Sequence, residues 1–334
     1  MQTDKYVFDM ERWKYLAQSD KLEEELKKTD SYEELISFST ARKYLLDWVP
    51  FAENSSVLEY ESGVGALTGM LADKADKVTC IEKNEKYTEI NRIRNKDRNN
   101  IRYLRNVDEV GDEEKFDYII MVNVNSTLTE VDSKKEIEKL IAKSGSYLKK
   151  NGVLILAVNN NESIHLLSGG VFGTDDEPYD GKKGISKQDL LAILERNMFT
   201  HTKFYYPMDN AIFPMCIYSD ELLPNEGDIP NQVFDISEQS FRMFDETKIF
   251  DQTIRNKTFD RYANSFLVFA SESDLQMNVI YCKNNYNRSS QYQTKTLICK
   301  ENEELVIYKK ALNPCAQSHI QRFGAAHKLI ADLY

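Results

Sequence analysis

Cysteine and histidine are scarce in this chain of 334 residues. Its 5 cysteines are scattered, and no two have the spacing of metal ligands. Their odd number also argues against a disulfide framework. We therefore expect neither a metal site nor redox chemistry, and the 4 histidines leave few imidazoles for a catalytic base.

Long hydrophobic runs are also missing. The longest runs, 118–122, 153–158 and 266–270, have the length of buried strands and are far shorter than the roughly 20 residues that span a bilayer. The first residues lead into no apolar signal region. We expect a chain without a transmembrane segment, located in the cytoplasm, whose 41% hydrophobic content suffices for a buried core.

The chain lacks an excess of positive charge. It has 43 Lys and Arg residues against 54 Asp and Glu residues, a formal net charge of -11. Proteins that bind nucleic acid without regard to sequence need a positive surface. The composition therefore argues against a nucleic-acid partner.

Short apolar runs alternate with helical periods between residues 57 and 160, the pattern of a parallel, doubly wound sheet. We expect an α/β fold with a seven-stranded, Rossmann-like sheet. Its strands are predicted at 56–60, 78–82, 101–104, 116–123, 152–158, 204–206 and 265–270. Helices are predicted near 65–74, 84–95, 131–149 and 186–194.

Three further segments surround this predicted sheet. Residues 1–50 read as N-terminal helices, over about 11–29 and 31–46, and 51–272 as the main domain. Residues 207–262, rich in proline and aromatics, read as an inserted lid or substrate segment. Residues 273–334 read as a small antiparallel sheet with a final helix, a β-rich appendage. Because the chain ends on an apolar helix, we also expect it to be the front part of a longer polypeptide.

A glycine turn follows the first strand, in the run from Val57 to Thr68, and Glu82 ends the second strand. A strand, a glycine turn, a helix and a strand ending in a carboxylate hold a nucleoside with a ribose in many α/β proteins. The glycines at 63, 65 and 69 miss the dinucleotide spacing by one residue. Glu59, just before the turn, would repel a pyrophosphate and suits a cationic ligand.

These motifs, with Asn106-Val107-Asp108 after the third strand and Phe116-Asp117-Tyr118 in the fourth, resemble the class I S-adenosylmethionine-dependent methyltransferases over about residues 50–270. The segment from Phe204 to Pro224 is similar to methyltransferases of bacterial capsule, O-antigen and other surface-polysaccharide biosynthesis. The resemblance implies S-adenosyl-L-methionine as the cofactor and O-methylation of a sugar in a surface glycan or its precursor. It also implies a small-molecule or glycan substrate, with the chain linked to or docked on a glycan-assembly enzyme.

The resemblance also implies roles for particular residues. Glu82 would accept both ribose hydroxyls, and Glu59 would hold the ammonium group of the cofactor or the turn itself. The other implied cofactor residues are Glu61, Ser62, Gly63 and Gly65 at the methionine half, Lys83, Val107 and Asp108 at the adenine, and Asn123 at the sulfonium. For Asp108, a solvated acidic loop is the alternative interpretation.

The reaction needs a base for the sugar hydroxyl, and the site should lie beyond the carboxyl ends of strands four to six. His165, in the loop after strand five, is the histidine placed near the expected cleft. Asp175 and Asp176, further along that loop, are the other candidate catalytic residues, although they could form a solvated turn before Pro178.

Two alternatives stay open. Glu61 stands where the family usually has glycine, which favours a non-catalytic scaffold in a glycan-assembly complex. The second alternative is a nicotinamide-dependent sugar-nucleotide enzyme, which would need a Tyr-x-x-x-Lys pair on a helix. Tyr179 and Lys183 have this spacing, but Pro178 and Gly181 indicate that their segment is a loop. The absence of an Asn-Pro-Pro-Tyr type motif after strand four further disfavours methylation of nucleic acid.

Overall fold

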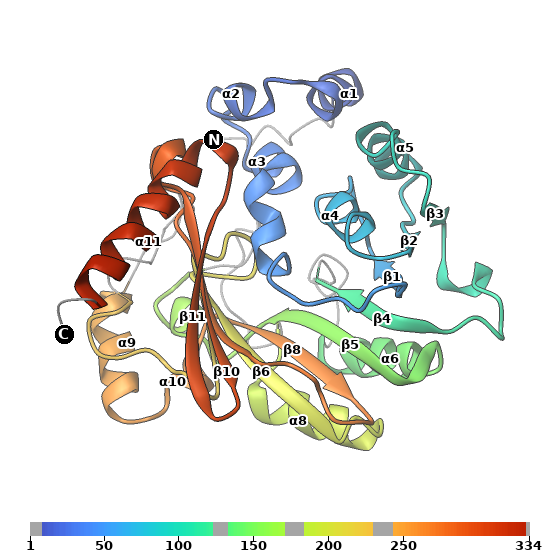
Figure 1. Ribbon diagram of the computed structural model, residues 1–334. Helices are drawn as coiled ribbons and strands as arrows, with labels where there is room; N and C mark the ends of the chain where they lie inside the picture. Colours follow the sequence, from blue (N-terminus) through green and yellow to red (C-terminus); the bar gives the residue numbers. More distant parts are fainter. Residues whose placement is uncertain (1–8, 123–132, 171–183, 230–242, 332–334) are drawn as a thin grey trace.

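The described strands form a single mixed sheet. The computed structural model describes residues 9–122, 133–170, 184–229 and 243–331. Its eleven strands have the order β11-β10-β9-β7-β6-β8-β5-β4-β1-β2-β3 (Figure 1). They are β1 (Ser56–Tyr60), β2 (Lys77–Ile81), β3 (Ile101–Leu104), β4 (Phe116–Met121), β5 (Leu148–Asn159), β6 (His201–Met208), β7 (Cys216–Ser219), β8 (Ser265–Ser271), β9 (Val279–Asn284), β10 (Thr294–Glu301) and β11 (Glu304–Ala311).

The five strands from β3 to β5 are parallel, as predicted. Because side chains alternate along each strand, both faces carry apolar residues and both are covered by helices. One face packs on α6 (Ser133–Gly145) and α8 (Lys187–Arg196), and the other on α4 (Thr68–Ala72) and the 3-10 helix η1 (Thr40–Leu45). The carboxyl ends of these strands therefore meet at one edge of the sheet.

The prediction of seven strands with a separate β-rich appendage is wrong. β7, inside the predicted lid segment, pairs with β6 on one side and with β9 on the other. Cys216 lies opposite Lys283, and Ile217 lies opposite Cys282. The last three strands therefore continue the main sheet in antiparallel order.

The helix predicted over 131–149 is also too long. α6 ends at Gly145 and β5 begins at Leu148, before the predicted stop at Gly152. The backbone N–H of Phe116 donates to the carbonyl of Tyr147, and the register of β4 on β5 shifts between Phe116 and Tyr118. This irregularity lets β5 start earlier than its apolar run.

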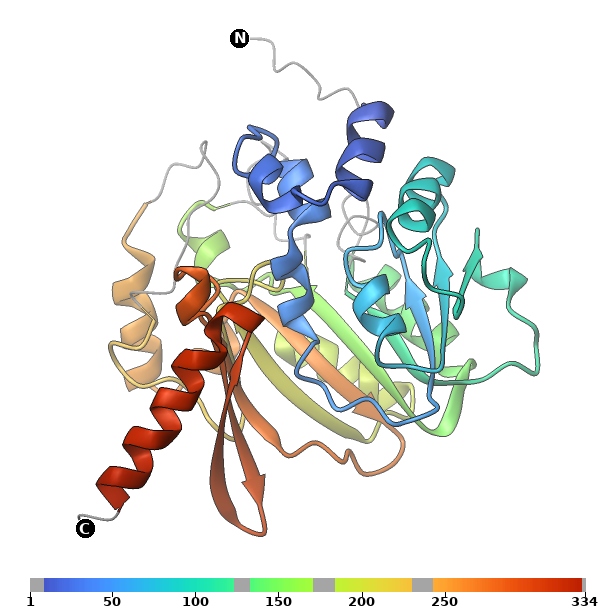
Figure 2. The same ribbon diagram turned by 45° about the horizontal axis from the view of Figure 1, so that its top comes forward.

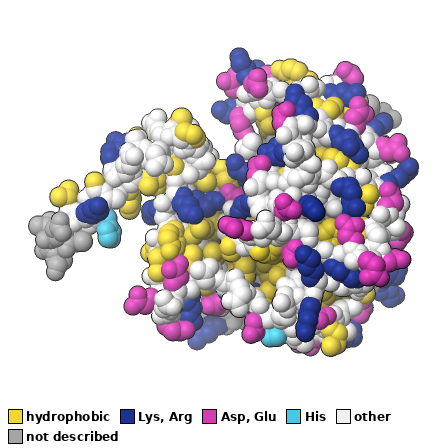
Figure 3. Space-filling view, turned by 45° about the vertical axis from the view of Figure 1, so that its right-hand side comes forward, with side chains coloured by type: hydrophobic (Ala, Val, Ile, Leu, Met, Phe, Trp, Pro, Cys, Tyr) yellow, Lys and Arg dark blue, Asp and Glu magenta, His cyan; other side chains and the backbone are white. Residues whose placement is uncertain are grey.

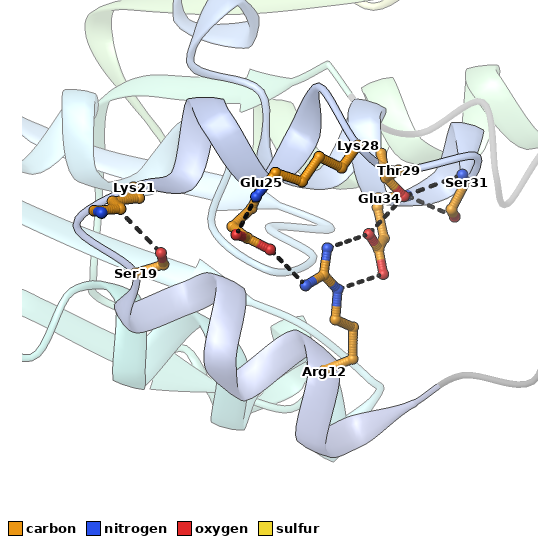
Figure 4. A network of polar contacts seen from close by, with 8 residues as sticks. All are labelled: Arg12, Ser19, Lys21, Glu25, Lys28, Thr29, Ser31 and Glu34. Atoms are coloured by element: carbon orange, nitrogen blue, oxygen red, sulfur yellow. Dashed lines mark hydrogen bonds and ion pairs between the residues drawn. The ribbon is translucent and has the colours of Figure 1, made fainter.

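The N-terminal region contains more helices than the two that were predicted. They are α1 (Met10–Gln18), α2 (Leu22–Leu26), α3 (Tyr32–Phe38) and η1. Arg12 of α1 donates to Glu25 of α2 at 3.1 Å and to Glu34 of α3 at 3.4 Å (Figure 4). Thr29 donates to the same Glu34 carboxylate at 2.7 Å. One guanidinium thus ties three helices together.

Helices complete the C-terminal half. They are α7 (Ile164–Leu167), α9 (Glu246–Arg255), α10 (Phe259–Tyr262) and α11 (Gln317–Ala331), with α5 (Glu85–Arg94) lying between β2 and β3 in the chain. α11 runs beside β10 and β11 and then projects from the body of the protein (Figures 2 and 3). Within the described residues, no helix is both long and apolar enough to cross a membrane.

Candidate functional site

The glycine turn joins β1 to α4 at the carboxyl edge of the parallel strands. Its backbone has positive φ at Glu61 (49°), Gly63 (54°) and Gly65 (79°). The N–H of Ser62 donates to the carbonyl of Ile81 at 3.1 Å, and the N–H of Gly65 to that of Ser62 at 3.0 Å. The turn therefore forms with a glutamate in the left-handed region, a conformation that costs an L-residue about 1–2 kcal/mol.

The two glycines of the turn have different surroundings. A Cβ atom at Gly63 would meet nothing within 4 Å, so this side of the turn is open. A Cβ atom at Gly65 would lie 2.3 Å from Oδ1 of Asn91 on α5. Gly65 is thus required by packing within the protein, whereas Gly63 faces space that a ligand can fill.

Glu82 follows β2 and binds the turn directly. One oxygen of its carboxylate accepts the N–H of Gly63 at 2.9 Å, and the other accepts the N–H of Asn84 at 2.8 Å. Each carboxylate oxygen has about two acceptor positions, so one position on each oxygen is left. Glu82 is half-buried, which keeps these positions within reach of hydroxyl donors.

Glu59 lies fully buried beneath the turn. Its Oε2 accepts from the hydroxyl of Thr68 at 2.6 Å and from the thiol of Cys80 at 3.4 Å. Its Oε1 has no hydrogen-bond partner among the described residues. Burial raises the pKa of Glu59 to about 7, with a smaller contribution from the nearby charge of Glu82. In this structure Glu59 holds the helix that follows the turn.

The network under the turn extends to α5. Nδ2 of Asn91 donates to Thr68 at 3.1 Å and to Ser62 at 3.4 Å. Nδ2 of Asn95 donates to Oδ1 of Asn91 at 2.8 Å. The sequence analysis did not identify these asparagines. Only their one-turn spacing distinguishes them locally from residues on the solvent-facing side of a helix.

The predicted adenine residues occupy the 3-10 helix η2 (Val107–Glu109) after β3. Val107 is buried, and the carboxylate of Asp108 is exposed and accepts from Lys143 of α6 at 2.7 Å. Lys83 is exposed beside Glu82. Asn123 lies outside the described residues. The role of each of these residues stays a prediction.

A cavity of about 400 Å³ adjoins Glu82. Its other lining residues come from α5, from β3 and from the loop and η2 that follow: Glu85, Thr88, Glu89, Arg92, Tyr103, Leu104, Arg105 and Glu109. Its volume lies in the range of small-molecule sites. Of the predicted cofactor residues it includes Glu82 alone, so it extends from Glu82 along α5 and away from the glycine turn.

His165, the predicted catalytic histidine, lies on α7 just after β5. Its Nδ1 is 3.6 Å from Oε1 of Glu246 on α9, and its side chain is 15% exposed. The same carboxylate oxygen accepts from Ser168 at 2.6 Å. His165 thus lies beside a buried carboxylate, and its role as the catalytic base stays a prediction. Asp175 and Asp176 lie outside the described residues, so their role stays a prediction.

Buried polar residues that the sequence analysis missed surround α7. Nδ2 of Asn264 donates to the Asp209 carboxylate at 3.0 Å, and its Oδ1 accepts the backbone N–H of His165 at 3.3 Å. Asn160 donates to the carbonyl of Ala263 at 2.7 Å. Asn160 and Asp209 directly follow buried strands, so the rule that singles out Glu82 could have found them as well.

The N-terminal helices contribute a buried cation near this edge. Burial lowers the pKa of Arg42 to about 10, and nearby Tyr32 opposes the shift. Burial raises the pKa of Tyr32, with Arg42 lowering it and Asp209 raising it further. Tyr32 and Arg42 therefore lie within electrostatic reach of each other, and Tyr32 within reach of Asp209.

Known proteins match part of this chain. The sequence model of the Methyltransferase small domain family matches residues 37–183. These residues contain the glycine turn, Glu82 and all five parallel strands, and the match supports an S-adenosylmethionine-dependent methyltransferase, the class that the sequence predicted. No curated protein sequence matches the chain.

Solved structures of methyltransferases are similar at low identity. A SAM-dependent methyltransferase from Archaeoglobus fulgidus is 13% identical, with a TM-score of 0.46, over 72% of this chain and 97% of that one. A possible histamine N-methyltransferase from Thermotoga maritima is 15% identical, with a TM-score of 0.42, over 79% and 100%. Phosphoethanolamine N-methyltransferase 1 from Haemonchus contortus is 14% identical, with a TM-score of 0.43, over 80% of this chain and 48% of its own, so the match spans about half of that enzyme.

Proposed function

We propose that the chain binds S-adenosylmethionine at the glycine turn and methylates a hydroxyl of a sugar in a surface glycan or its precursor. The observation that carries the binding site is the contact between Glu82 and Gly63. The carboxylate that ends β2 holds the N–H of a glycine whose Cβ direction is open. The sugar substrate rests on the sequence resemblance of residues 204–224.

The residues around the turn fit the proposed cofactor. Glu82 keeps one acceptor position on each oxygen, which suits two neighbouring ribose hydroxyls. Gly63 and the backbone of Glu61 and Ser62 would line the methionine half. Gly65 would support cofactor binding indirectly, because it lets the turn pack closely against α5. Glu59 would also support it indirectly, by holding Thr68 of α4. Lys83, Val107, Asp108 and Asn123 remain the proposed contacts of the adenine and the sulfonium.

When bound, the cofactor supplies a methyl group on a positively charged sulfur. The protein's part is to align the hydroxyl, which can lower the barrier by about 7–11 kcal/mol. We assign the base to His165. If Glu246 favours the proton on Nδ1, Nε2 carries the lone pair that takes the hydroxyl proton. Asp175 and Asp176 are the alternative bases.

Titration calorimetry with S-adenosylhomocysteine tests the cofactor site. Glu82→Gln replaces one charged acceptor, and we expect about 10- to 100-fold weaker binding. Asp73→Asn is the matched control, because Asp73 is an exposed carboxylate at the end of α4 that pairs with Arg98 at 2.9 Å. Equal affinity of both variants and the wild type would refute the assignment of Glu82.

The non-catalytic scaffold remains a second candidate, favoured by the positive φ of Glu61. Compared with glycine, a glutamate at this position adopts a positive φ less readily, and it places a charged side chain at the turn. If the wild-type chain fails to bind S-adenosylhomocysteine at millimolar concentration, the scaffold becomes the better account. A titration with NADH in parallel tests the nicotinamide-dependent alternative, whose proposed Tyr179 and Lys183 lie outside the described residues.

The proposed setting follows from the substrate. For a substrate that is a glycan precursor, we propose that the chain acts in the cytoplasm and docks on, or is linked to, a glycan-assembly enzyme. Co-purification of the chain with that enzyme from its source cells would test this arrangement. Recovery of the chain alone, with full methyltransferase activity, would argue against docking.

A further inference from the structure

A second cavity, of about 250 Å³, lies between α11 and the last three strands, far along the sheet from the glycine turn (Figure 1). We call it the basic cavity. Its lining residues are Lys283, Asn285, Arg288, Thr294, Thr296, Lys309, His319, Ile320 and Phe323. It shares no lining residue with the cavity beside Glu82.

Three of these residues form one row across three strands. Lys283 of β9 lies opposite Thr296 of β10, and Thr296 lies opposite Lys309 of β11. Directly opposed residues point to the same face of a sheet, and neighbouring strands are about 4.8 Å apart. The two lysines therefore flank a threonine hydroxyl on the face that α11 covers.

The positive charges of the basic cavity are not balanced. Among the residues that the structure describes, no Asp or Glu lines it. Among the described residues, none forms an ion pair with Lys283, Arg288 or Lys309. This is unusual in a chain of net charge -11, in which many other lysines and arginines do have carboxylate partners. Gathered cations without a counter-charge repel one another, and an anion among them removes that cost.

Polar and aromatic side chains that line the basic cavity hold its charged groups in place. Nζ of Lys309 lies over the ring of Phe323 on α11, at 4.3 Å from its centroid, which holds the ammonium by a cation–π contact. His319 packs edge-on against Tyr292 at 5.3 Å between ring centroids. Asn285 donates to the hydroxyl of Thr294 at 3.4 Å. The basic cavity is thus a built site of side chains from three strands, one loop and one helix.

We propose that the basic cavity binds the phosphate group of a small phosphorylated molecule. Ammonium groups, a guanidinium and hydroxyls are the groups that recognise phosphate oxygens. Its volume lies below the range of about 300–1,000 Å³ for whole drug-sized ligands, so it takes a phosphate or diphosphate group with a small organic part. Ile320 and Phe323 supply the apolar contact for that part. This site does not depend on the proposed methyltransferase function.

Titration calorimetry of the full chain with inorganic pyrophosphate tests the proposal. We expect saturable binding to the wild type, at least tenfold weaker binding to the double variant Lys283→Gln, Lys309→Gln, and weaker binding at high salt. Lys310→Gln is the matched control. Lys310 is the next residue of β11, lies on its other face and does not line the cavity, so this variant should bind as the wild type does.

The single variant Arg288→Gln keeps the proposal testable if the double variant does not fold. Arg288 is exposed in the loop after β9, so its loss should weaken pyrophosphate binding without unfolding the chain. Sedimentation with phosphatidylcholine vesicles, with and without phosphatidic acid, distinguishes a lipid phosphate from a soluble one; we expect a soluble phosphate and no sedimentation. Absence of pyrophosphate binding, equal binding by the Lys310→Gln and double variants, or binding to phosphatidic acid alone would overturn the proposal.

Discussion

The parallel and antiparallel halves of the sheet differ in charge and in how they are built. The parallel half, from β3 to β5, carries carboxylates at the glycine turn, with Glu59 buried and Glu82 half-buried. The antiparallel half, from β8 to β11, carries the uncompensated cations of the basic cavity. One continuous sheet therefore carries both the acidic site that we propose for a nucleoside with a cationic group and the basic site that we propose for a phosphate.

The halves also differ in what holds them. In the parallel half the glycine turn is held by a partner that follows closely in sequence: the N–H of Gly63 donates to Glu82, 19 positions further along the chain. In the antiparallel half β7 pairs with β9 although about 60 residues of chain separate the two strands. Lys295 of β10 forms an ion pair with Asp47 of the N-terminal region. Because contacts between residues far apart in sequence hold the antiparallel half together, its stability depends on the rest of the protein.

Breaking the ion pair between Asp47 and Lys295 should have the largest effect on stability. Both side chains are largely buried, with 15% and 10% exposed. Asp47→Asn would leave the Lys295 ammonium without its counter-charge, and we expect a loss of about 3–5 kcal/mol in the free energy of unfolding. Urea unfolding measures the loss. Asp73→Asn, which breaks an exposed pair with Arg98, should cost no more than about 1 kcal/mol. Similar costs for both variants would mean that the antiparallel half is not anchored through Lys295.

Glu59→Gln should change how the stability of the parallel half depends on pH. The pKa of Glu59 rises from 4.5 to about 7 on folding. Between these values the folded protein keeps a proton that the unfolded chain has lost, so wild-type stability falls as the pH rises through this window and then levels off. Glutamine does not ionise. From about pH 4.5 to about pH 8 the variant should therefore gain about 3 kcal/mol relative to the wild type.

Urea unfolding of both proteins at the two ends of this window measures that gain. The amide of glutamine keeps an oxygen that can accept from Thr68, so the contact of Glu59 can survive the change. A difference between variant and wild type that does not change with pH would show that Glu59 ionises normally in the folded protein.

Alanine at the two turn glycines should separate packing from ligand binding. Both residues have positive φ, which costs about 1–2 kcal/mol for alanine. Gly65→Ala adds a clash with Asn91, so its total cost should exceed that of Gly63→Ala by about 1–3 kcal/mol. Gly63→Ala should instead lower the affinity for S-adenosylhomocysteine in calorimetry. An equal loss of stability in both variants would contradict the different surroundings of the two glycines.

Asp108→Ala should have the smallest effect on stability. Its exposed pair with Lys143 should contribute no more than about 1 kcal/mol to the free energy of unfolding. If Asp108 contacts the adenine, the variant should bind S-adenosylhomocysteine about tenfold more weakly, because a charged hydrogen bond is lost. Lys143→Gln removes the same pair and keeps the carboxylate. Wild-type affinity in the Asp108→Ala variant would favour the solvated acidic loop.

The parallel half could be predicted closely from the sequence, because its signals are local. The first strand, 56–60, and the third, 101–104, have the predicted bounds, and the strand-end carboxylate Glu82 lies beside the predicted turn. Apolar runs of strand length, separated by single helices, leave few alternatives for a right-handed parallel sheet. The match of the Methyltransferase small domain to residues 37–183 supports the enzyme class predicted from these motifs.

The antiparallel half could not be predicted in the same way. β7 has four residues and lies within a proline-containing segment, so its apolar pattern was too short to mark a strand. Its pairing with β9 decides that one sheet forms instead of two, and no local pattern encodes that pairing. The contact of His165 with Glu246 joins residues about 80 positions apart for the same reason.

Hydrogen exchange with added ligands tests the difference between the two halves most directly. With S-adenosylhomocysteine, we expect slower exchange of the amides in 61–65 and 82–86, where the N–H of Gly63 binds Glu82, and unchanged exchange in 279–311. With inorganic pyrophosphate, we expect the reverse. Protection of 279–311 by S-adenosylhomocysteine, or no protection of 61–65, would contradict the assignment of the nucleoside site to the parallel half.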